Sequence, residues 1–339
     1  MAFAPAVVLK APLALAVESP YGGAMTAAFS ARPGAIQRLW GSAYLLLCLT
    51  VLIWAGNSVV GRAIHGVVPP MALAFWRWAL ALAAILPAAA PHLRRDWPLI
   101  RRGWPILLVL GLTGAAAFPS LLYWGLQYTT ALNSVLLQAA IPPLVLLAAF
   151  ILFRERASAG QLAGVAVSLA GVLVIIAEGR PWMLLHLGLN IGDAAILFGI
   201  VLYASYPTLL RRKPDIHPLS LLVCLFAVGA VTVLPFYALE IASGRLITAG
   251  PAAAGALAYV SLAASVIAYL FFNRGVALIG AGRAGQFVHL MPVFGAVLAV
   301  LLLHERLQLY HLAGVALIGV GIGLASIRRR PLAAEAARG

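Results

Sequence analysis

The sequence predicts an all-α membrane protein with ten transmembrane helices arranged as two inverted five-helix repeats. Three observations support this fold class. Of the 339 residues, 63% are hydrophobic and only 9% are charged, whereas a soluble domain carries about a quarter charged residues. The chain contains apolar segments long enough to cross a bilayer, which takes about 20 residues each. Finally, the chain repeats itself without gaps at an offset of 150 residues.

The apolar segments follow one another along the chain with short polar connections. We expect ten spans at residues 40–61, 69–90, 104–126, 132–153, 158–177, 191–210, 219–240, 252–273, 284–303 and 308–327. The first five form a first repeat, residues 40–178, and the last five form a second repeat, residues 190–327. Residues 1–39 are expected to form a disordered cytoplasmic tail, with Met25 as an alternative start, and residues 328–339 a basic cytoplasmic tail.

The internal repeat is clearest in the segments that begin at Pro142 and at Pro292. Over 35 aligned positions 11 residues are identical, including both prolines and the Glu-Arg pairs at 155–156 and 305–306. A duplication of this kind in a membrane chain is typical of transporters built from two related halves. Because each half holds five spans, an odd number, the second half must be inverted relative to the first.

The basic residues favour one orientation of these spans. The net charge is +14, with 23 Lys and Arg. If the N-terminus is cytoplasmic, 18 of them fall on the cytoplasmic side, four on the outer side, and Arg77 within the membrane. Since Lys and Arg concentrate in cytoplasmic loops, we expect both termini to be cytoplasmic in a cell inner membrane. The same placement in short loops argues against nucleic acid as a partner.

Several enzyme and motor motifs are absent from the sequence. Lys10 and Lys213 are the only lysines, and neither completes a phosphate-binding G-x-x-x-x-G-K-[ST] loop. The sequence also lacks an H-E-x-x-H zinc helix and a G-x-S-x-G nucleophile elbow. We therefore expect no cofactor, no metal and no enzymatic activity. An intramembrane enzyme and a non-transporting membrane scaffold stay open as alternatives.

Charged side chains within the spans are candidates for function, because an ionisable group at membrane depth is costly. Arg77 lies in the second predicted span, and Asp193 lies near the outer end of the sixth. We expect Arg77 to face a cavity, an acidic partner such as Asp193, or helix carbonyls. Locking helices together and attracting an anion both stay open as its role.

The ninth span carries two polar residues that its counterpart lacks. His289 and Gln286 lie three residues apart and therefore share a helix face. The matching residues of the first repeat, Ala139 and Leu136, are apolar, so the halves differ where a binding site needs asymmetry. A hydrogen-bonded packing role for His289 stays open beside a role in binding substrate or a proton.

Prolines are expected to bend the fourth and ninth spans. Gln138 precedes Pro142 and Pro143 by one turn, and Pro292 occupies the matching place in the second half. A proline removes a backbone hydrogen bond and kinks the helix, and freed carbonyls that face a cavity can bind substrate. The matched positions predict a pair of hinges, and a simple bend without a ligand is the alternative.

Aromatic and amide residues deep in the spans are further cavity candidates. Trp54 with Ala55 and Tyr203 with Ala204 match at an offset of 149, and Asn57 follows in the first of these spans. Tyr123 lies near the end of the third span and Asn273 at the end of the eighth. Aromatic residues near span ends are more often interfacial anchors than ligands. Glycine-rich faces of the fifth and tenth spans predict helix packing or contact within a homodimer.

These motifs resemble the EamA family of the drug/metabolite transporter superfamily over residues 40–327. The resemblance is carried by Trp54-Ala55-Gly56-Asn57, Arg77, Ala131-Leu132 before Pro142, Glu155-Arg156, Gly192-Asp193 and Tyr203-Ala204. It implies a central cavity lined by spans 1, 3, 4, 6, 8 and 9, alternating access, and small organic substrates such as amino acids or metabolites. Pro142-Pro143 departs from the single proline that is usual there.

The sequence is therefore interpreted as a secondary transporter of small organic solutes embedded in the lipid bilayer. The predicted cavity contains Trp54, Asn57, Arg77, Tyr123, Gln138, Tyr203, Asn273, Gln286 and His289, with Asp193 as the charge partner of Arg77. His289 or Asp193 is expected to carry a coupled proton, because both are titratable groups at membrane depth.

Overall fold

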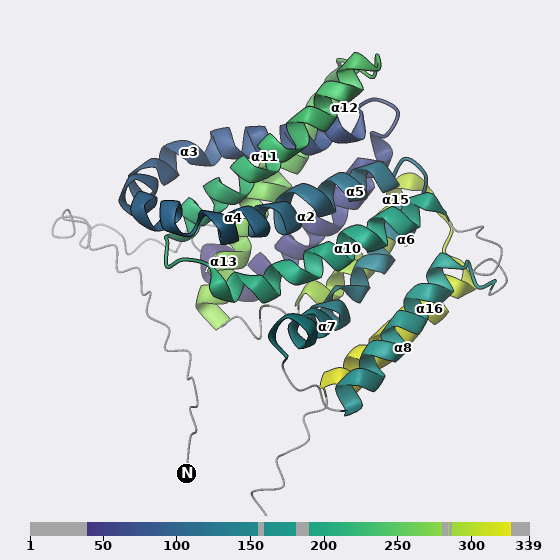
Figure 1. The fold of residues 1–339 in the computed structure, drawn as a ribbon. Coiled ribbons are helices and arrows are strands. Elements are labelled where there is room, and N and C mark those ends of the chain that lie inside the picture. Colours follow the sequence, from purple (N-terminus) through teal and green to yellow (C-terminus); the bar gives the residue numbers. More distant parts are fainter. Residues whose placement is uncertain (1–38, 155–158, 181–189, 280–283, 285–286, 327–339) are drawn as a thin grey trace, which may run out of the picture. The chain divides into compact units, whose positions relative to one another are not determined.

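The computed structural model describes residues 39–154, 159–180, 190–279, 284 and 287–326. Residues 1–42 form a separate unit, and the account below concerns the unit from Ala43 onwards. Within the described residues every regular element is helical (Figure 1). The elements of the first half are α2 (Ala43–Ala63), α3 (Pro70–Arg102), α4 (Trp104–Gly111), η1 (Leu112–Ala117), α5 (Phe118–Gly125), α6 (Ala131–Leu137), η2 (Gln138–Ala140), α7 (Ile141–Phe153) and α8 (Ala159–Ile176).

The second half follows the same order. Its elements are α10 (Ile191–Leu209), η3 (Leu210–Arg212), α11 (Pro218–Ala242), α12 (Pro251–Ala258), η4 (Tyr259–Ile267), α13 (Ala268–Ile279), η5 (Phe287–Leu290), α15 (Met291–Leu303) and α16 (Leu309–Ser326). Among the described residues, eight helical stretches are long and apolar enough to cross a membrane. Two shorter apolar helices, Phe287–Leu303 and Leu309–Leu324, occupy the places of the ninth and tenth predicted spans.

The second span is longer than the sequence suggested. We expected it to end at residue 90, but α3 has 33 residues and continues to Arg102 through Pro87, Pro91 and Pro98. This extension carries Asp96, which the sequence places in a loop, onto a helix. Asp96 keeps only 8% of its surface exposed.

Helices α3 and α11 are joined at both ends by carboxylates. Glu240, near the end of α11, accepts hydrogen bonds from the backbone nitrogens of Met71 and Ala72 at the start of α3, at 3.1 and 2.9 Å. Asp96, near the end of α3, accepts one from the backbone nitrogen of His217 at the start of α11, at 2.8 Å. The first backbone N–H groups of a helix have no partner within the helix, so each carboxylate satisfies donors of the other. The two helices must therefore run antiparallel.

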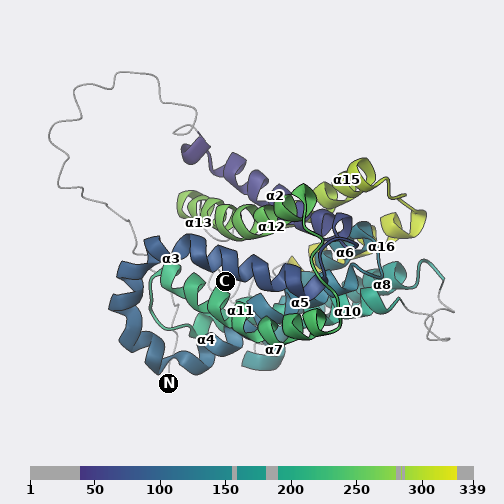
Figure 2. The same ribbon diagram turned by 90° about the horizontal axis from the view of Figure 1, so that it is seen from above.

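The packing of the remaining helices links the two halves reciprocally. Helix α2 packs against α13 and α15 of the second half, and α10 packs against α5 and α7 of the first half. Helices α8 and α16 lie side by side, as Figures 1 and 2 show from two directions. A Cβ atom added to Gly171 would lie 2.6 Å from the backbone oxygen of Gly314. The predicted small-residue faces thus bring α8 and α16 together within one chain.

Departures from regular α-helix recur at matched positions in both halves. The third and eighth spans contain π-helices, at η1 and η4, and the fourth and ninth contain 3-10 turns, at η2 and η5. A proline lies within the first two positions of each helix that follows a 3-10 turn, α7 and α15. Arg154 and His304, 150 residues apart, both end their helices in the left-handed conformation, with φ of 52° and 53°. π-helices are rare and frequently occur at functional sites.

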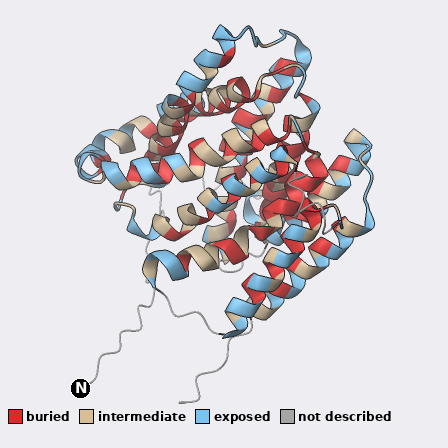
Figure 3. Ribbon diagram, turned by 45° about the vertical axis from the view of Figure 1, so that its right-hand side comes forward, coloured by how far each residue is buried: buried red, intermediate tan, exposed pale blue. Residues whose placement is uncertain are grey.

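The buried side chains lie where these helices face one another. Figure 3 shows buried positions on the inward faces and exposed positions on the outward faces. Many outward residues are large and apolar, such as Leu309 at 84% exposure and Val231 at 70%. Exposed apolar surface on this scale fits a lipid environment better than water.

Candidate functional site

The most unusual group in the interior is the guanidinium of Arg77 on α3, which is 7% exposed. Its Nη1 donates hydrogen bonds to Asn57 Oδ1 at 3.1 Å and to the Tyr123 hydroxyl at 2.8 Å. Its Nε donates to Ser265 Oγ at 2.9 Å. Tyr123 in turn donates to Asn57 Oδ1 at 2.7 Å. We call Asn57, Arg77, Tyr123 and Ser265 the arginine cluster.

The arginine cluster joins the two halves of the chain. Asn57, Arg77 and Tyr123 come from α2, α3 and α5 of the first half, whereas Ser265 comes from the π-helix η4 of the second. Ser265 also donates to the carbonyl of Val260, five residues earlier, at 2.8 Å. The wider turn of the π-helix therefore orients the serine hydroxyl that receives Arg77. Three of the cluster residues were predicted site residues, and the structure brings them into direct contact.

The expected pairing of Arg77 with Asp193 is wrong. Asp193 is 1% exposed, and it accepts hydrogen bonds from Thr129 Oγ1 at 2.5 Å and from Asn133 Nδ2 at 3.1 Å. Asn133 Oδ1 is in turn 2.9 Å from His311 Nε2. His311 Nδ1 accepts from the backbone nitrogen of Gln308, so Nε2 carries the proton when the ring is neutral. Asp193 thus belongs to a second polar network, and neutral groups surround Arg77.

Aromatic rings lie beside the arginine cluster. Trp54 donates from Nε1 to the carbonyl of Ala264 at 3.2 Å, and its ring centroid lies 5.7 Å from that of Tyr269. The ring of Tyr203 lies 5.2 Å from Phe118 and 5.7 Å from Tyr206. Tyr206 and Tyr269 pack against the buried cluster that contains Trp78, whose ring centroid lies 4.7 Å from the guanidinium carbon of Arg77. The predicted residues Trp54 and Tyr203 therefore belong to the surroundings of the cluster.

Gln138 and His289 line a cavity that is separate from the arginine cluster. This cavity has a volume of about 300 Å³ and also has Pro142 and Pro292 in its wall. Gln138 donates to Ser58 Oγ at 3.1 Å and to the carbonyl of Ser134 at 3.0 Å. His289 is exposed on η5. The matched prolines of the two halves thus face one shared cavity, and Pro143 lies buried beside Pro142.

One predicted cavity residue, Asn273, is not brought to either place. Asn273 is exposed on α13 and forms no hydrogen bond with the part of the chain that the structure describes. Its position along the span could not reveal that it lies on an exposed face of α13, which continues to Ile279. Gln286 lies outside the described residues.

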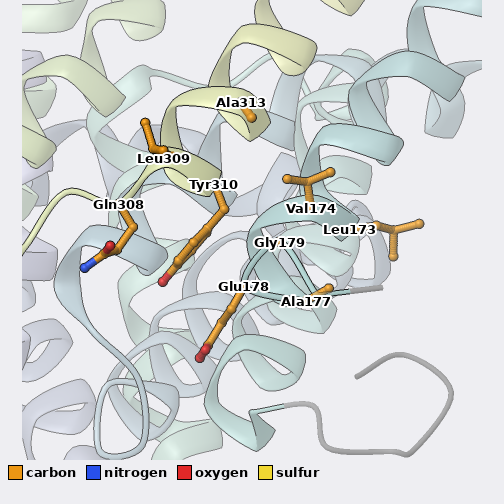
Figure 4. Close-up of a pocket in the computed structure, with 9 residues that line it drawn as sticks. All are labelled: Leu173, Val174, Ala177, Glu178, Gly179, Gln308, Leu309, Tyr310 and Ala313. Carbon is orange, nitrogen blue, oxygen red and sulfur yellow. The ribbon is translucent and has the colours of Figure 1, made fainter. Parts of the chain in front are cut away.

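A larger hollow of about 660 Å³ lies where the end of α8 meets the start of α16. Figure 4 shows Glu178 and Tyr310 among the side chains that line it, beside Gln308 and Leu309. Most of its wall is apolar, and the arginine cluster is not part of it. No pattern in the sequence predicts this hollow, because it depends on where α8 ends and α16 begins in space.

Comparison with known proteins explains the repeated architecture. The model of the EamA-like transporter family matches the chain twice, over residues 41–177 and 190–327. The chain belongs to the EamA-like transporter family. An uncharacterized transporter of Bacillus subtilis, YyaM, is 28% identical to this EamA-like protein over 84% of the chain and 93% of its own length. The chain is therefore a multi-pass membrane protein of a transporter family.

Two further relatives have names that include a solute. A probable terminal-alkyne amino-acid exporter of Streptantibioticus cattleyicolor is 30% identical over 83% of this chain and 90% of its own length. A probable amino-acid metabolite efflux pump of Escherichia coli is 28% identical over 82% and 92%. One solved crystal structure matches 88% of this EamA-like chain and 99% of its own with a TM-score of 0.56 at 20% identity. That likeness supports the fold alone.

Proposed function

We propose that this protein is a secondary-active exporter of small organic solutes that works by alternating access. In this proposal the chain has ten spans in two inverted five-helix repeats, residues 40–178 and 190–327, in the inner membrane with both termini cytoplasmic. The distribution of Lys and Arg among the loops supports the orientation. The antiparallel pair α3 and α11, with its reciprocal carboxylate caps, supports the inversion. Export, as opposed to import, follows the names of the relatives.

The observation that carries the proposal is the arginine cluster between the halves. A buried guanidinium is expensive, and within membrane proteins such groups line substrate or ion pathways. Here the guanidinium extends from α3 and donates to α2 and α5 of its own half and to η4 of the other. A solute bound at this point contacts both halves. Substrate sites of inverted-repeat transporters lie at the repeat interface.

The matched helix breaks supply the movable parts in this mechanism. Helices α7 and α15 each follow a 3-10 turn and each carry a proline in their first turn. Backbone hydrogen bonds are lost at such points, so the flanking segments can rotate at a low cost. Both breaks border the cavity that contains Gln138 and His289. We infer that rocking about Pro142, Pro143 and Pro292 exposes the central site to each side in turn.

Proton coupling through Asp193 or His289 is part of the same proposal. Asp193 is buried among neutral partners, and a carboxylate in such surroundings is a candidate proton carrier. The test is solute flux driven by an imposed pH gradient in the Asp193→Asn and His289→Ala variants. One of them should lose the dependence on the gradient, and full dependence in both contradicts the coupling role.

The transport function itself is tested in proteoliposomes that contain the purified full-length chain. We expect saturable counterflow of at least one solute from a panel of amino acids, carboxylates, amines and neutral metabolites. The Arg77→Gln variant should lose this flux, whereas Arg245→Gln, which removes an equal charge from an exposed position, should keep it. No saturable flux across the panel would favour a membrane scaffold, and chemical conversion of a solute would favour an enzyme.

A further inference from the structure

We propose that the arginine cluster binds a carboxylate, and that the solute is a small monocarboxylate with an aromatic or apolar body. This inference rests on the proposed transport function and names the chemical class of its solute. It follows from the charge, the unused donors and the rings around Arg77.

No carboxylate of the described residues neutralises the positive charge of Arg77. Its three hydrogen-bond partners are an amide oxygen, a phenol and a serine hydroxyl, and a guanidinium does not deprotonate in proteins. Four buried or bonded acids of the described chain are engaged elsewhere: Asp96, Asp193, Glu240 and Glu305 accept from backbone or side-chain groups of other helices. An uncompensated charge in the interior is strongly unfavourable. An anion that binds beside Arg77 removes this cost, so the site favours anionic solutes.

The guanidinium also has donors left for such an anion. Of its five N–H groups, the Nε–H and the two Nη1–H groups are directed at Ser265, Asn57 and Tyr123. Both N–H groups of Nη2 lack a hydrogen-bond partner among the described residues, although the guanidinium carbon lies 4.7 Å from the centroid of the Trp78 ring. Two donors on one nitrogen suit the oxygens of a carboxylate, since charge-assisted bonds from Arg to carboxylate are stronger than neutral ones.

Unpaired phenols lie around the same charge. Tyr203, Tyr206 and Tyr269 are each partly exposed, and none forms a hydrogen bond within the described part of the chain. Interior tyrosine hydroxyls usually have a partner. Tyr206 and Tyr269 pack against the same buried cluster as Trp78, the neighbour of Arg77, and the ring of Tyr203 lies 5.7 Å from that of Tyr206. These hydroxyls are therefore available to a polar group of a solute held at Arg77.

The aromatic rings near Arg77 indicate the chemical character of the rest of the solute. Tyr269 packs near Trp54, and Tyr203 packs near Phe118, so an apolar or aromatic body finds ring faces on two sides. No carboxylate of the described residues pairs with Arg77 or with these three phenols. An α-ammonium group would lack an acidic partner and would be repelled by Arg77. The surroundings thus favour a monocarboxylate over the corresponding amino acid.

The test is equilibrium binding to the full-length protein in lipid nanodiscs, by calorimetry, with three probes of one shape. These are 3-phenylpropionate, its amide, and L-phenylalanine, which differ in the carboxylate charge and in the ammonium group. We expect 3-phenylpropionate to bind at least tenfold more tightly than either of the others. Arg77→Gln should remove the preference for the carboxylate over the amide, and Arg245→Gln should preserve it. Tyr203→Phe, which leaves the arginine cluster intact, should weaken carboxylate binding severalfold.

The wild-type comparison decides the proposal even if a variant fails to fold. Equal binding of the amide and the carboxylate, or a preserved preference in Arg77→Gln, overturns the assignment of Arg77. Binding of phenylalanine as tight as that of 3-phenylpropionate overturns the monocarboxylate class. Saturable counterflow of amines or neutral solutes, without carboxylate binding, refutes this inference while the proposed transport function stands.

Discussion

Glu240 offers the sharpest quantitative test of the fold, because one side chain satisfies two donors of another helix. Its carboxylate accepts from Met71 N at 3.1 Å and from Ala72 N at 2.9 Å, and it is 8% exposed. Hydrogen bonds to a charged group contribute about 1.5–3 kcal/mol each, and neutral ones about 1 kcal/mol. Glutamine keeps the shape but offers one neutral acceptor. We therefore expect Glu240→Gln to lower the free energy of unfolding by about 2–5 kcal/mol.

The assay is unfolding in mixed micelles of increasing SDS content, followed by tryptophan fluorescence. The matched control is Asp215→Asn, which removes the same charge from an exposed loop residue and should change stability by less than about 0.5 kcal/mol. Asp96→Asn acts at the other end of α11, which has 25 residues and so extends about 37 Å. At that separation the two losses should add. If Glu240→Gln is as stable as the control, the reciprocal capping argument is refuted.

Three further predictions follow from the described contacts. The first concerns His217, which precedes α11 and whose ring centroid lies 3.6 Å from that of the stacked His92 ring. Burial and the neighbouring His92 lower the pKa of His217, and Asp96 opposes that shift. In the unfolded chain this histidine is protonated below about pH 6.5, whereas in the folded chain it stays neutral to a lower pH. The free energy of unfolding should therefore be highest above pH 6.5 and fall as the pH drops below it. His217→Asn, whose side-chain oxygen can replace Nδ1 as the acceptor for Leu219 N, should flatten this dependence in unfolding measured from pH 7.5 to 5. Gly321→Ala should cost about 1–3 kcal/mol, since its Cβ meets the Gly164 carbonyl and Ser168. Gly323→Ala meets nothing within 4 Å and should be neutral or stabilising in the same assay. Tyr123→Phe should cost about 1–3 kcal/mol and slow transport, because the hydroxyl links Arg77 to Asn57; unchanged values for both would contradict its place in the site.

The sequence could reveal the spans and the repeat because both depend on local composition. It could also single out Asn57, Arg77 and Tyr123 one by one, since polar groups in apolar segments are conspicuous. It could not show that they touch, because their contacts join helices whose separation in space is independent of their spacing along the chain. Ser265 was missed because a serine in an apolar run is common, and only the π-helix of η4 directs it at Arg77.

The acidic residues show why the Arg77 partner was predicted wrongly. With few acids in the chain, a buried arginine and a buried aspartate are natural candidates for a pair. The structure instead uses the acids at helix starts: Glu305 accepts from Ala131 N and Leu132 N at 2.9 and 2.7 Å, as Asp96 and Glu240 do at α11 and α3. Helix starts present unpaired N–H groups and a positive dipole end, and no periodicity in the sequence reports which acid reaches them. Among the described residues, Arg77 is therefore left without a carboxylate partner.

The duplication explains how a symmetric frame can hold an asymmetric site. Both α3 and α11 begin with a proline, Pro70 and Pro218, and from these starts Arg77 corresponds to Leu225 and Trp78 to Phe226. Both halves keep an aromatic residue at the second of these positions, and the rings of Trp78 and Phe226 contact each other with centroids 4.9 Å apart. At the first position only one half has a cation, Arg77. A second guanidinium at position 225, which is 4% exposed, would bury another unpaired charge in the same interior. The frame therefore supplies two copies of the helix breaks and caps, which the proposed alternating access requires. It supplies one copy of the charge, which suits the single solute site that we propose.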